Sequence, residues 1–200
     1  MDFLPIYKSK HDNQADLSME ECVFLGRMIG DGYWNKKHFG ILFNKKEKDV
    51  GEEMLFNLGI EFTRCERGNI YEYSLRGRSY WKSRLGLVDY VQGRKVLPRV
   101  LLEMSSEQLL GVFKGWVDAD GYKGKDGTQH LISANKELIF DLQALLSSHG
   151  IRSSINVSQI VFDGNAEGEG RRDRTTKSYT TTHPRNIRRL HKLYSQHSIN

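Results

Sequence analysis

Long apolar runs and cysteine patterns are both missing from this 200-residue sequence. No run approaches the roughly 20 apolar residues that a membrane-spanning helix needs, and the N-terminal stretch is too polar for a secretion signal. The two cysteines, Cys22 and Cys65, match no zinc or redox spacing, so we expect a reduced intracellular protein whose compartment stays open. Because long apolar runs are missing, we expect no membrane partner. Because no P-loop pattern occurs, we expect no nucleotide cofactor.

Positive charge is in excess and is unevenly distributed. The net charge is +5, and the sequence pI is about 9.1. Residues 171–200 carry eight Lys and Arg against one Asp, a local charge of +7 that leaves −2 for the rest of the chain. A basic excess of this size suits a polyanionic partner, with nucleic acid as the first candidate, although a solvated basic tail has the same composition.

One short stretch occurs twice. FLGRMIGDG at 24–32 and FKGWVDADG at 113–121 each place a glycine six positions before a final glycine, and each has an aspartate before that final glycine. The two aspartates, Asp31 and Asp120, are 89 positions apart. Similarity at a fixed offset predicts two copies of one structural unit.

The elements around the two stretches recur in the same order. Each half begins with a helix that a capping box opens, Ser18-x-x-Glu21 or Ser105-x-x-Gln108. A hairpin, an amphipathic helix, a second hairpin and a last helix follow in each half. The expected ranges are 32–44, 47–60, 61–77 and 79–91 in the first half, and 121–135, 135–151, 152–183 and 184–196 in the second.

This order predicts an α+β protein made of two pseudo-symmetric αββαββα halves. Each half has a four-stranded antiparallel sheet with helices on one face, which leaves the other face free. The first half covers residues 1–90, a linker covers 91–104, and the second half covers 105–200. The two halves are expected to form one compact pseudo-dimeric unit.

Small residues recur on the repeated helices. A glycine inside a helix costs about 1 kcal/mol relative to alanine, so its repetition there needs a reason. Two helices can approach until their backbones touch where such residues share one face, and we infer that the repeated helices meet in this way at the seam of the two halves. The residues at these matching i, i+4 positions are Gly26, Gly30, Gly115 and Ala119.

The same packing brings Asp31 and Asp120 to one end of the helix pair. Two carboxylates that are held close repel each other, and divalent cations relieve this repulsion. Hard cations such as Mg²⁺ bind carboxylates and keep water and phosphate oxygens as their other ligands, and paired metals support phosphodiester hydrolysis. The alternative is that each aspartate merely ends its helix, which explains one Asp-Gly more readily than two on symmetric repeats.

The two stretches resemble the signature helices of the LAGLIDADG homing endonucleases, in the monomeric form with two motifs. The resemblance extends from about residue 18 to 197. The first motif departs more from the family, because Ile29 stands where members often have an acid, and its GDG ending is common among intein-type members. The second motif keeps the family residues Gly115, Asp118, Ala119, Asp120 and Gly121.

The resemblance implies a monomeric, site-specific endonuclease that hydrolyses both strands of a long asymmetric duplex, of the kind associated with intron or intein mobility. The sequence leaves open whether the gene lies in an intron, in an intein or alone. Two sheets would form a saddle over the DNA, and β-hairpins would enter the major groove. Asp31 and Asp120 would share two or three Mg²⁺ ions, and each acid would serve one strand. By the same resemblance, the backbone carbonyls of Gly30 and Ala119 would complete the metal shells.

Members of the family also carry a basic residue near each acid. In the intein-type group one lysine lies in a K-x-x-P segment before the second motif, which here corresponds to Lys95 and Pro98. This lysine would orient water or stabilise charge on the phosphorane, unless it is only a linker residue. The family's second lysine usually follows the last helix, and this sequence shows none there. Lys123, three positions after Asp120, is our candidate, because some archaeal-type members use a lysine at that spacing.

Basic residues gather at the predicted hairpins. Arginine and lysine contact phosphates and guanine edges alike, so the sequence does not separate these two roles. Neutralising about six to ten phosphates would make DNA binding steeply dependent on salt. The candidate DNA-binding residues are Lys36, Lys37, His38, Arg64, Arg67, Arg76, Arg78, Lys125, Arg171, Arg172, Arg174 and Lys177.

Other functions remain open on the same fold. A maturase or a regulator would bind RNA or DNA with reduced catalysis, but the two acids speak against this because they would repel phosphate. A splicing intein would need a nucleophile at its first residue and an N-terminal β-rich domain, which Met1 and the short lead-in do not provide. The remaining alternative is a basic two-lobed protein that binds no metal.

Overall fold

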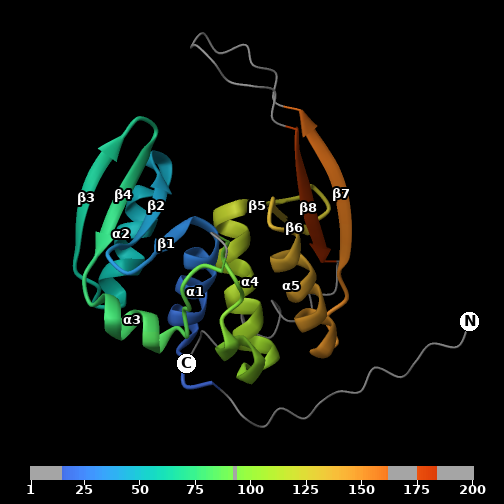
Figure 1. Ribbon diagram of the computed structural model, residues 1–200, viewed down its shortest axis with the longest axis horizontal. Helices are drawn as coiled ribbons and strands as arrows, with labels where there is room; N and C mark the ends of the chain where they lie inside the picture. The colour runs from blue at the N-terminus through green and yellow to red at the C-terminus, as the bar shows by residue number, and fades with distance from the viewer. Residues whose placement is uncertain (1–14, 92–93, 162–174, 184–200) are drawn as a thin grey trace, which may run out of the picture. The chain divides into compact units, whose positions relative to one another are not determined.

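The computed structural model describes residues 15–91, 94–161 and 175–183 (Figure 1). The chain divides into two compact units, Met1–Asp120 and Gly121–Asn200. The first unit therefore contains both repeated helices. The boundaries predicted from the sequence, with a linker over 91–104, stay a prediction.

The first unit follows the predicted αββαββα order and adds the second repeated helix. Its strands form a four-stranded antiparallel sheet in the order β1-β2-β4-β3. The elements are α1 (Met19–Asp31), β1 (Gly32–Trp34), β2 (Phe39–Asn44), the 3₁₀ turn η1 (Lys45–Glu47), α2 (Lys48–Asn57), β3 (Phe62–Arg67), β4 (Ile70–Leu75), α3 (Arg78–Arg84), the 3₁₀ turn η2 (Arg99–Glu103) and α4 (Ser106–Asp120).

Alternation along the strands gives this sheet a covered face and an open face. On β2, the buried residues Phe39, Ile41 and Phe43 point to the side on which the helices pack. Directly paired residues share a face, so Tyr73, opposite Ile41, belongs to the covered side, while Glu72, opposite Leu42, belongs to the open side. The hydrophobic core of this unit therefore lies on one face of the sheet, as predicted.

The glycine faces of α1 and α4 meet, and the two helices lie side by side (Figure 1). A Cβ added at Gly26 would lie 1.9 Å from the backbone oxygen of Val112, and one added at Gly115 would lie 2.0 Å from that of Val23. Both separations are far below any van der Waals contact. The prediction of a backbone-to-backbone helix contact is therefore confirmed.

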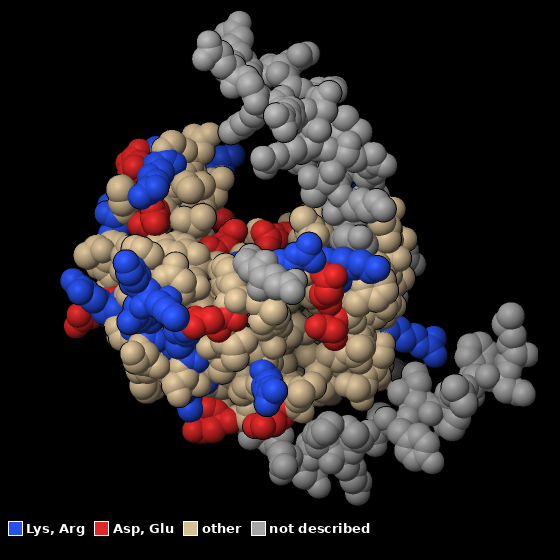
Figure 2. All heavy atoms as spheres, in the orientation of Figure 1, with Lys and Arg blue, Asp and Glu red and all other residues tan. Residues whose placement is uncertain are grey.

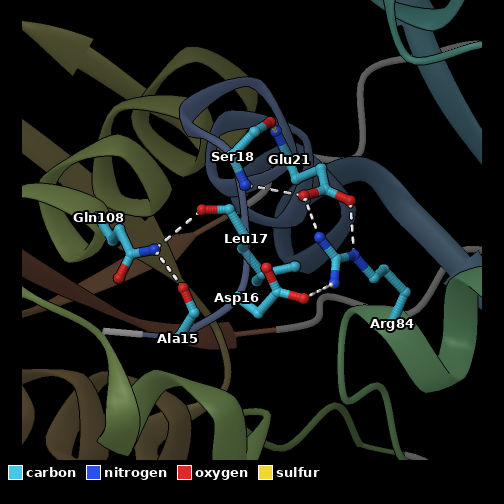
Figure 3. Close-up of polar contacts among 7 residues, drawn as sticks. All are labelled: Ala15, Asp16, Leu17, Ser18, Glu21, Arg84 and Gln108. Atoms are coloured by element: carbon cyan, nitrogen blue, oxygen red, sulfur yellow. Dashed lines mark hydrogen bonds and ion pairs between the residues drawn. The ribbon is translucent and has the colours of Figure 1, made fainter. Parts of the chain in front are cut away.

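A network of hydrogen bonds joins the N-terminal ends of the two helices (Figure 3). Both predicted capping boxes are present: the backbone N–H of Glu21 donates to Ser18, and that of Gln108 donates to Ser105. The buried Gln108 amide also donates to the backbone oxygens of Ala15 at 2.7 Å and of Leu17 at 2.9 Å. This amide therefore ties the start of α4 to the segment that leads into α1.

The last helix of the first half is shorter than predicted. The sequence pattern indicates a helix over 79–91, but α3 ends at Arg84. Gly86 has a φ of +61°, in the left-handed region, and the backbone N–H of Leu87 donates to the carbonyl of Lys82. This is the hydrogen bonding by which a glycine closes a helix. The chain then continues without regular structure, and the carbonyl of Val88 accepts a hydrogen bond of 2.6 Å from the Trp34 indole.

The second unit repeats the topology of the first sheet. Its strands have the order β5-β6-β8-β7, all antiparallel, and α5 packs on them. The hairpin predicted over 121–135 is present, and Gly127 in its turn has a φ of +81°. The helix predicted over 184–196 lies outside the described residues. The elements are β5 (Gly121–Lys123), β6 (Gln129–Ser133), α5 (Lys136–Ser148), β7 (Ser154–Val161) and β8 (Thr175–His183).

The predicted α+β fold, with the same strand order in both halves, is thus confirmed for the described residues. Within them, no helix is long and apolar enough to cross a membrane.

Candidate active site

Asp31 and Asp120 are the last residues of α1 and α4, and both lie in the first unit. A carboxylate at the C-terminal end of a helix faces the negative end of the helix dipole, which is electrostatically unfavourable. Neither helix has a basic residue in its last turn to offset this charge. The helices gain no stability from these acids, so their presence needs a reason other than folding.

The two carboxylates influence each other. The pKa of Asp31 is raised to about 6, chiefly by burial and also by the charge of Asp120, while Arg27 and Lys95 oppose the rise. Asp120 is more exposed than the half-buried Asp31, but atoms around its carboxylate still displace water and raise its pKa, and Lys95 again opposes the rise. The two side chains predicted to form a pair are therefore electrostatically coupled.

Lys95 lies against the C-terminal end of α1. Its Nζ donates to the backbone oxygen of Ile29 at 2.8 Å and to that of Gly30, and it lies 5.4 Å from the centre of the Trp34 ring. Burial lowers the pKa of Lys95 to about 8, while the charges of Asp120 and Asp31 favour its protonated form. The lysine identified from the K-x-x-P segment thus lies close to both acids.

A buried ion pair next to Asp31 was not predicted from the sequence. Arg27, one turn before Asp31 on α1, is 6% exposed, and its guanidinium is 3.1 Å from Glu47. This guanidinium also lies over the Phe43 ring, 5.5 Å from its centre. No local pattern marks the pair, because Arg27 and Glu47 are 20 residues apart and meet only when β1 and β2 fold back.

The donors at this end of the helix pair are suitable for a hard divalent cation. The carboxylates of Asp31 and Asp120 supply oxygen ligands, and the Gly30 carbonyl, which now accepts from Lys95, supplies another. A Cβ added at Gly30 would lie 2.5 Å from that of Ala119 and 3.3 Å from an oxygen of Asp120, so the two motif ends lie close together. In the described part of the chain no group of three or more His, Cys, Asp or Glu forms a complete metal shell. A cation here would therefore need water or phosphate oxygens as well.

The basic residues predicted in the first half occupy different faces. Lys36, Lys37 and His38 are exposed in the β1–β2 turn, where the backbone N–H groups of Lys37 and His38 donate to Asn35. Arg76 and Arg78 line a shallow hollow of about 370 Å³ together with Lys37. These side chains form one basic edge of the unit.

Arg64 and Arg67 lie on opposite faces of β3. Arg64 is bound to Glu52 of α2 and lies 4.8 Å from the centre of the Tyr71 ring, which places it on the covered face. Arg67 lies on the open face, with its Nε 2.6 Å from Glu72. Both arginines were predicted to contact DNA, but a large partner could reach Arg67 more easily than Arg64.

In the second unit, Lys123 ends β5 and Lys125 lies in the following turn, and both are exposed. The backbone of Lys177 pairs with Gln159 between β8 and β7. Arg171, Arg172 and Arg174 lie outside the described residues. The exposed ring of Tyr122 stacks on His130 at 4.4 Å, a surface aromatic pair that was not predicted.

Charges of both signs share the visible surface. Figure 2 shows Lys and Arg side chains interspersed with Asp and Glu, without one continuous basic face. Several basic side chains of the described residues form ion pairs, among them Lys45 with Glu66 and Lys82 with Asp89. Affinity for a polyanion would therefore depend on particular unpaired positions more than on total charge.

Comparison with known sequences identifies two similarities. Residues 107–193 match the model of the LAGLIDADG-like domain. Over 139 residues, 66% of this chain, the sequence is 33% identical to a probable translation initiation factor IF-2 of Methanocaldococcus jannaschii. The match spans 12% of the length of that protein.

Comparison with solved structures identifies the fold. I-DmoI in complex with DNA and Ca has a TM-score of 0.55 and 16% identity, with 90% of this chain and 91% of that chain covered. A second structure, of mesophilic variants of the homing endonuclease I-DmoI, has a TM-score of 0.53 and 15% identity, covering 86% and 92%. The N-terminal LAGLIDADG domain of WhiA has a TM-score of 0.51 and 8% identity, covering 99% and 95%.

Proposed function

Because this chain belongs to the LAGLIDADG family, we propose that it is a divalent-metal-dependent endonuclease that cuts both strands of a specific, asymmetric DNA duplex. The observation that carries the proposal is the pair of coupled carboxylates, Asp31 and Asp120, at the C-terminal ends of two helices in backbone contact. Their place at the negative ends of two helix dipoles opposes stability, which supports a functional role.

Asp31, Asp120 and the carbonyls of Gly30 and Ala119 are the proposed ligands for Mg²⁺. When bound, such ions activate a water molecule and stabilise the leaving oxygen of the cleaved P–O bond. The solved relatives support divalent metals as a class, because I-DmoI is described in complex with DNA and Ca and with DNA and Mn. We propose two or three ions shared between the acids.

Lys95 has the proposed role of the basic residue at the site. Its ammonium lies close to both carboxylates, and the partial burial that lowers its pKa to about 8 strengthens its field at a reacting phosphate. As an ammonium its Nζ carries three N–H donors, and through them it can donate a hydrogen bond to water or to a phosphoryl oxygen. Lys123 is the proposed counterpart for the second strand.

DNA would be bound through the open faces of the two sheets and their basic hairpins, by one chain acting as a monomer. In the first unit the proposed contacts are Lys36, Lys37 and His38 in the turn, Arg76 and Arg78 at the basic edge, and Arg67 on the open face. Arg64 is left out because its guanidinium is held on the covered face by Glu52. Lys125 and Lys177, with Arg171, Arg172 and Arg174, are the proposed contacts of the second half.

We further propose that the gene for this module is mobile. The relative in Methanocaldococcus jannaschii is a probable translation initiation factor, and the similar segment spans only 12% of it. A nuclease-like module inside a translation protein suggests an inserted element. If so, the preferred cleavage site would match the uninterrupted host gene at the insertion point. A preferred site unrelated to that junction would contradict this part of the proposal.

The main test is cleavage of a randomised duplex library in Mg²⁺ and in Ca²⁺ by the wild type, Asp31→Asn and Asp120→Asn. We expect the wild type to select one long site and to cut both strands in Mg²⁺. Each variant should leave at least one strand of that site intact, and Asp118→Asn, on the same helix, serves as the matched control. A site that is bound but cut by none of the proteins would favour a binding protein such as a regulator or maturase.

A further inference from the structure

A row of side chains crosses the open face of the first sheet from edge to edge. Tyr33 on β1, Gly40 on β2, Glu72 on β4 and Arg67 on β3 follow the spatial order of the strands. The row is diagonal, because Gly40 is paired with Ser74 and Arg67 with Ile70, each two positions from Glu72 on β4. The Tyr33 hydroxyl donates to one carboxylate oxygen of Glu72 at 2.9 Å. The Nε of Arg67 lies 2.6 Å from the other oxygen. Both oxygens of this carboxylate are therefore engaged.

Gly40 is what allows the tyrosine to reach across β2. A Cβ at this position would lie 2.3 Å from the Tyr33 hydroxyl oxygen and 2.4 Å from its Cζ. Any larger residue would therefore displace the phenol ring from its path to Glu72. Gly40 thus leaves the space in which the Tyr33 ring lies. Because Tyr33 fixes the Glu72 carboxylate, that carboxylate can in turn fix the orientation of Arg67.

The ion pair with Glu72 leaves the outer edge of the Arg67 guanidinium exposed and able to bind a partner. The Arg67 side chain is 66% exposed, whereas that of Glu72 is 21% exposed. Within the described residues, Glu72 is the ion-pair partner of Arg67, and the guanidinium nitrogen nearest to its carboxylate is Nε. The two Nη groups therefore present a fixed fork of donors, which matches the two acceptors O6 and N7 of a guanine edge.

Charge decides between a base and a phosphate as the ligand. The carboxylate of Glu72 beside the guanidinium offsets its positive charge, which weakens its attraction for a phosphate and adds repulsion. The hydrogen-bonding geometry of the fork is retained, and its orientation is fixed in advance. A neutral base edge benefits from this arrangement, because bidentate recognition depends on geometry more than on charge.

We propose that Arg67 reads one guanine in the major groove of the DNA target, and that Glu72 and Tyr33 are positioning residues for it. The proposal rests on the proposed DNA-binding function, and it specifies which base is recognised and which residue recognises it. The second sheet lacks this arrangement, since the register places Ser158 and Thr180 at the positions that correspond to Arg67 and Glu72. The guanine preference therefore belongs to one half of the target only.

The test compares binding-site selection from a randomised duplex library, in Ca²⁺ so that no cleavage is needed, for the wild type, Arg67→Ala, Glu72→Gln and Tyr33→Phe. The wild type should require a G·C pair at one position, with about 10- to 100-fold discrimination that Arg67→Ala abolishes. Glu72→Gln and Tyr33→Phe should weaken discrimination at that position alone. Neither change should have a further effect in the Arg67→Ala background.

The possible outcomes separate this inference from the function on which it rests. Arg64→Ala, on the same strand but the covered face, is the matched control and should leave the selected sequence unchanged. If Arg67→Ala weakens binding to all sequences equally and lowers the salt slope by about one, Arg67 contacts a phosphate and the inference is wrong. An unchanged profile for folded Arg67→Ala also overturns it. If the wild type selects no sequence, the proposed function itself fails.

Discussion

The Nζ of Lys95 lies 2.8 Å from the backbone oxygen of Ile29, so a lysine 66 residues away donates to the C-terminal end of α1. The same ammonium donates to the Gly30 carbonyl, which is a proposed ligand for Mg²⁺. In this structure a side chain of the protein therefore supplies positive charge beside two acids that would otherwise repel each other. A metal ion bound at Gly30 would bring a second positive charge to a carbonyl that already accepts from Lys95.

Removing the Asp31 charge should stabilise the metal-free protein. The pKa of Asp31 in the folded state is about 6, above its ordinary value of 3.8, so between these values the folded state holds more protons than the unfolded state. Stability therefore falls as pH rises through this window, and the loss is complete at pH 7. With allowance for solvent screening, Asp31→Asn should gain about 1 kcal/mol at pH 7 and almost nothing at pH 3.

Urea denaturation of metal-free protein at the two pH values measures this difference. Asp118→Asn, the matched control on α4, should change the free energy of unfolding by less than about 0.5 kcal/mol. A loss of stability in Asp31→Asn at pH 7 would mean that Asp31 is held by favourable contacts, which is contrary to the raised pKa.

Replacement of Lys95 should slow DNA cleavage. Lys95→Met keeps much of the apolar stem and should lower the cleavage rate by about 10²- to 10³-fold, as expected for the loss of a charged donor near a reacting phosphate. Lys95→Arg should not restore the rate, because a planar fork does not reproduce the compact ammonium. Single-turnover cleavage at saturating enzyme makes the comparison, and equal rates for wild type and Lys95→Met would remove Lys95 from the mechanism.

The pH dependence of stability gives a second test of Lys95. Its pKa of about 8 in the folded state lies below its ordinary value of 10.5, so in this interval the unfolded state binds more protons. The Lys95 contribution to stability therefore rises as pH increases from about 8 towards 10.5. The wild type should gain in melting temperature relative to Lys95→Met over this interval. A constant difference would show that the lysine keeps its proton.

Alanine at Gly26 should destabilise the protein although alanine favours helix. Propensity alone predicts a gain of about 1 kcal/mol inside a helix. The added Cβ would lie 1.9 Å from the Val112 oxygen, so the two helices must separate, and we expect a net loss of about 3 kcal/mol. Chemical denaturation gives the sign directly. A gain in stability would show that α1 and α4 are not in backbone contact in solution.

Gln108→Glu should disrupt the N-terminal ends of the two helices. The substitution keeps the shape but replaces the amide donor by a carboxylate, which would face the backbone oxygens of Ala15 and Leu17. We expect a loss of about 2–3 kcal/mol at pH 7, with partial recovery at pH 4, where a protonated acid can donate one hydrogen bond. Thermal melts at both pH values measure it. A loss that does not depend on pH would argue for a packing cause.

Local patterns predicted the repeated elements well. The capping boxes at Ser18 and Ser105 mark the starts of their helices within a few neighbouring residues, and the structure confirms them. The helix predicted over 79–91 was too long because its apolar spacing continues past Gly86, whereas the left-handed conformation of Gly86 ends α3. Spacing alone does not reveal a backbone angle.

The rest of the site depends on contacts that sequence spacing does not contain. Arg64 and Arg67 are three positions apart on one strand, so alternation places them on opposite faces, but only the pairing of β3 with β4 shows which of them lies on the covered face. Tyr33 meets Glu72 across 39 residues because β2, with a glycine at the crossing, lies between their strands. Lys95 was found through the family motif, and its contact with α1 is a tertiary one.

Both acids belong to the compact unit that ends at Asp120, while the second sheet begins at the next residue. The chain thus keeps both proposed metal-binding acids in one unit, whereas Lys123 and much of the proposed recognition belong to the other. Under the proposed function, selection could alter the recognition residues within 121–200 to follow a drifting target, and protein engineers could exchange them between relatives, without rebuilding the helix contact that holds the two carboxylates. Such a division would offer a modular route to new DNA sequences.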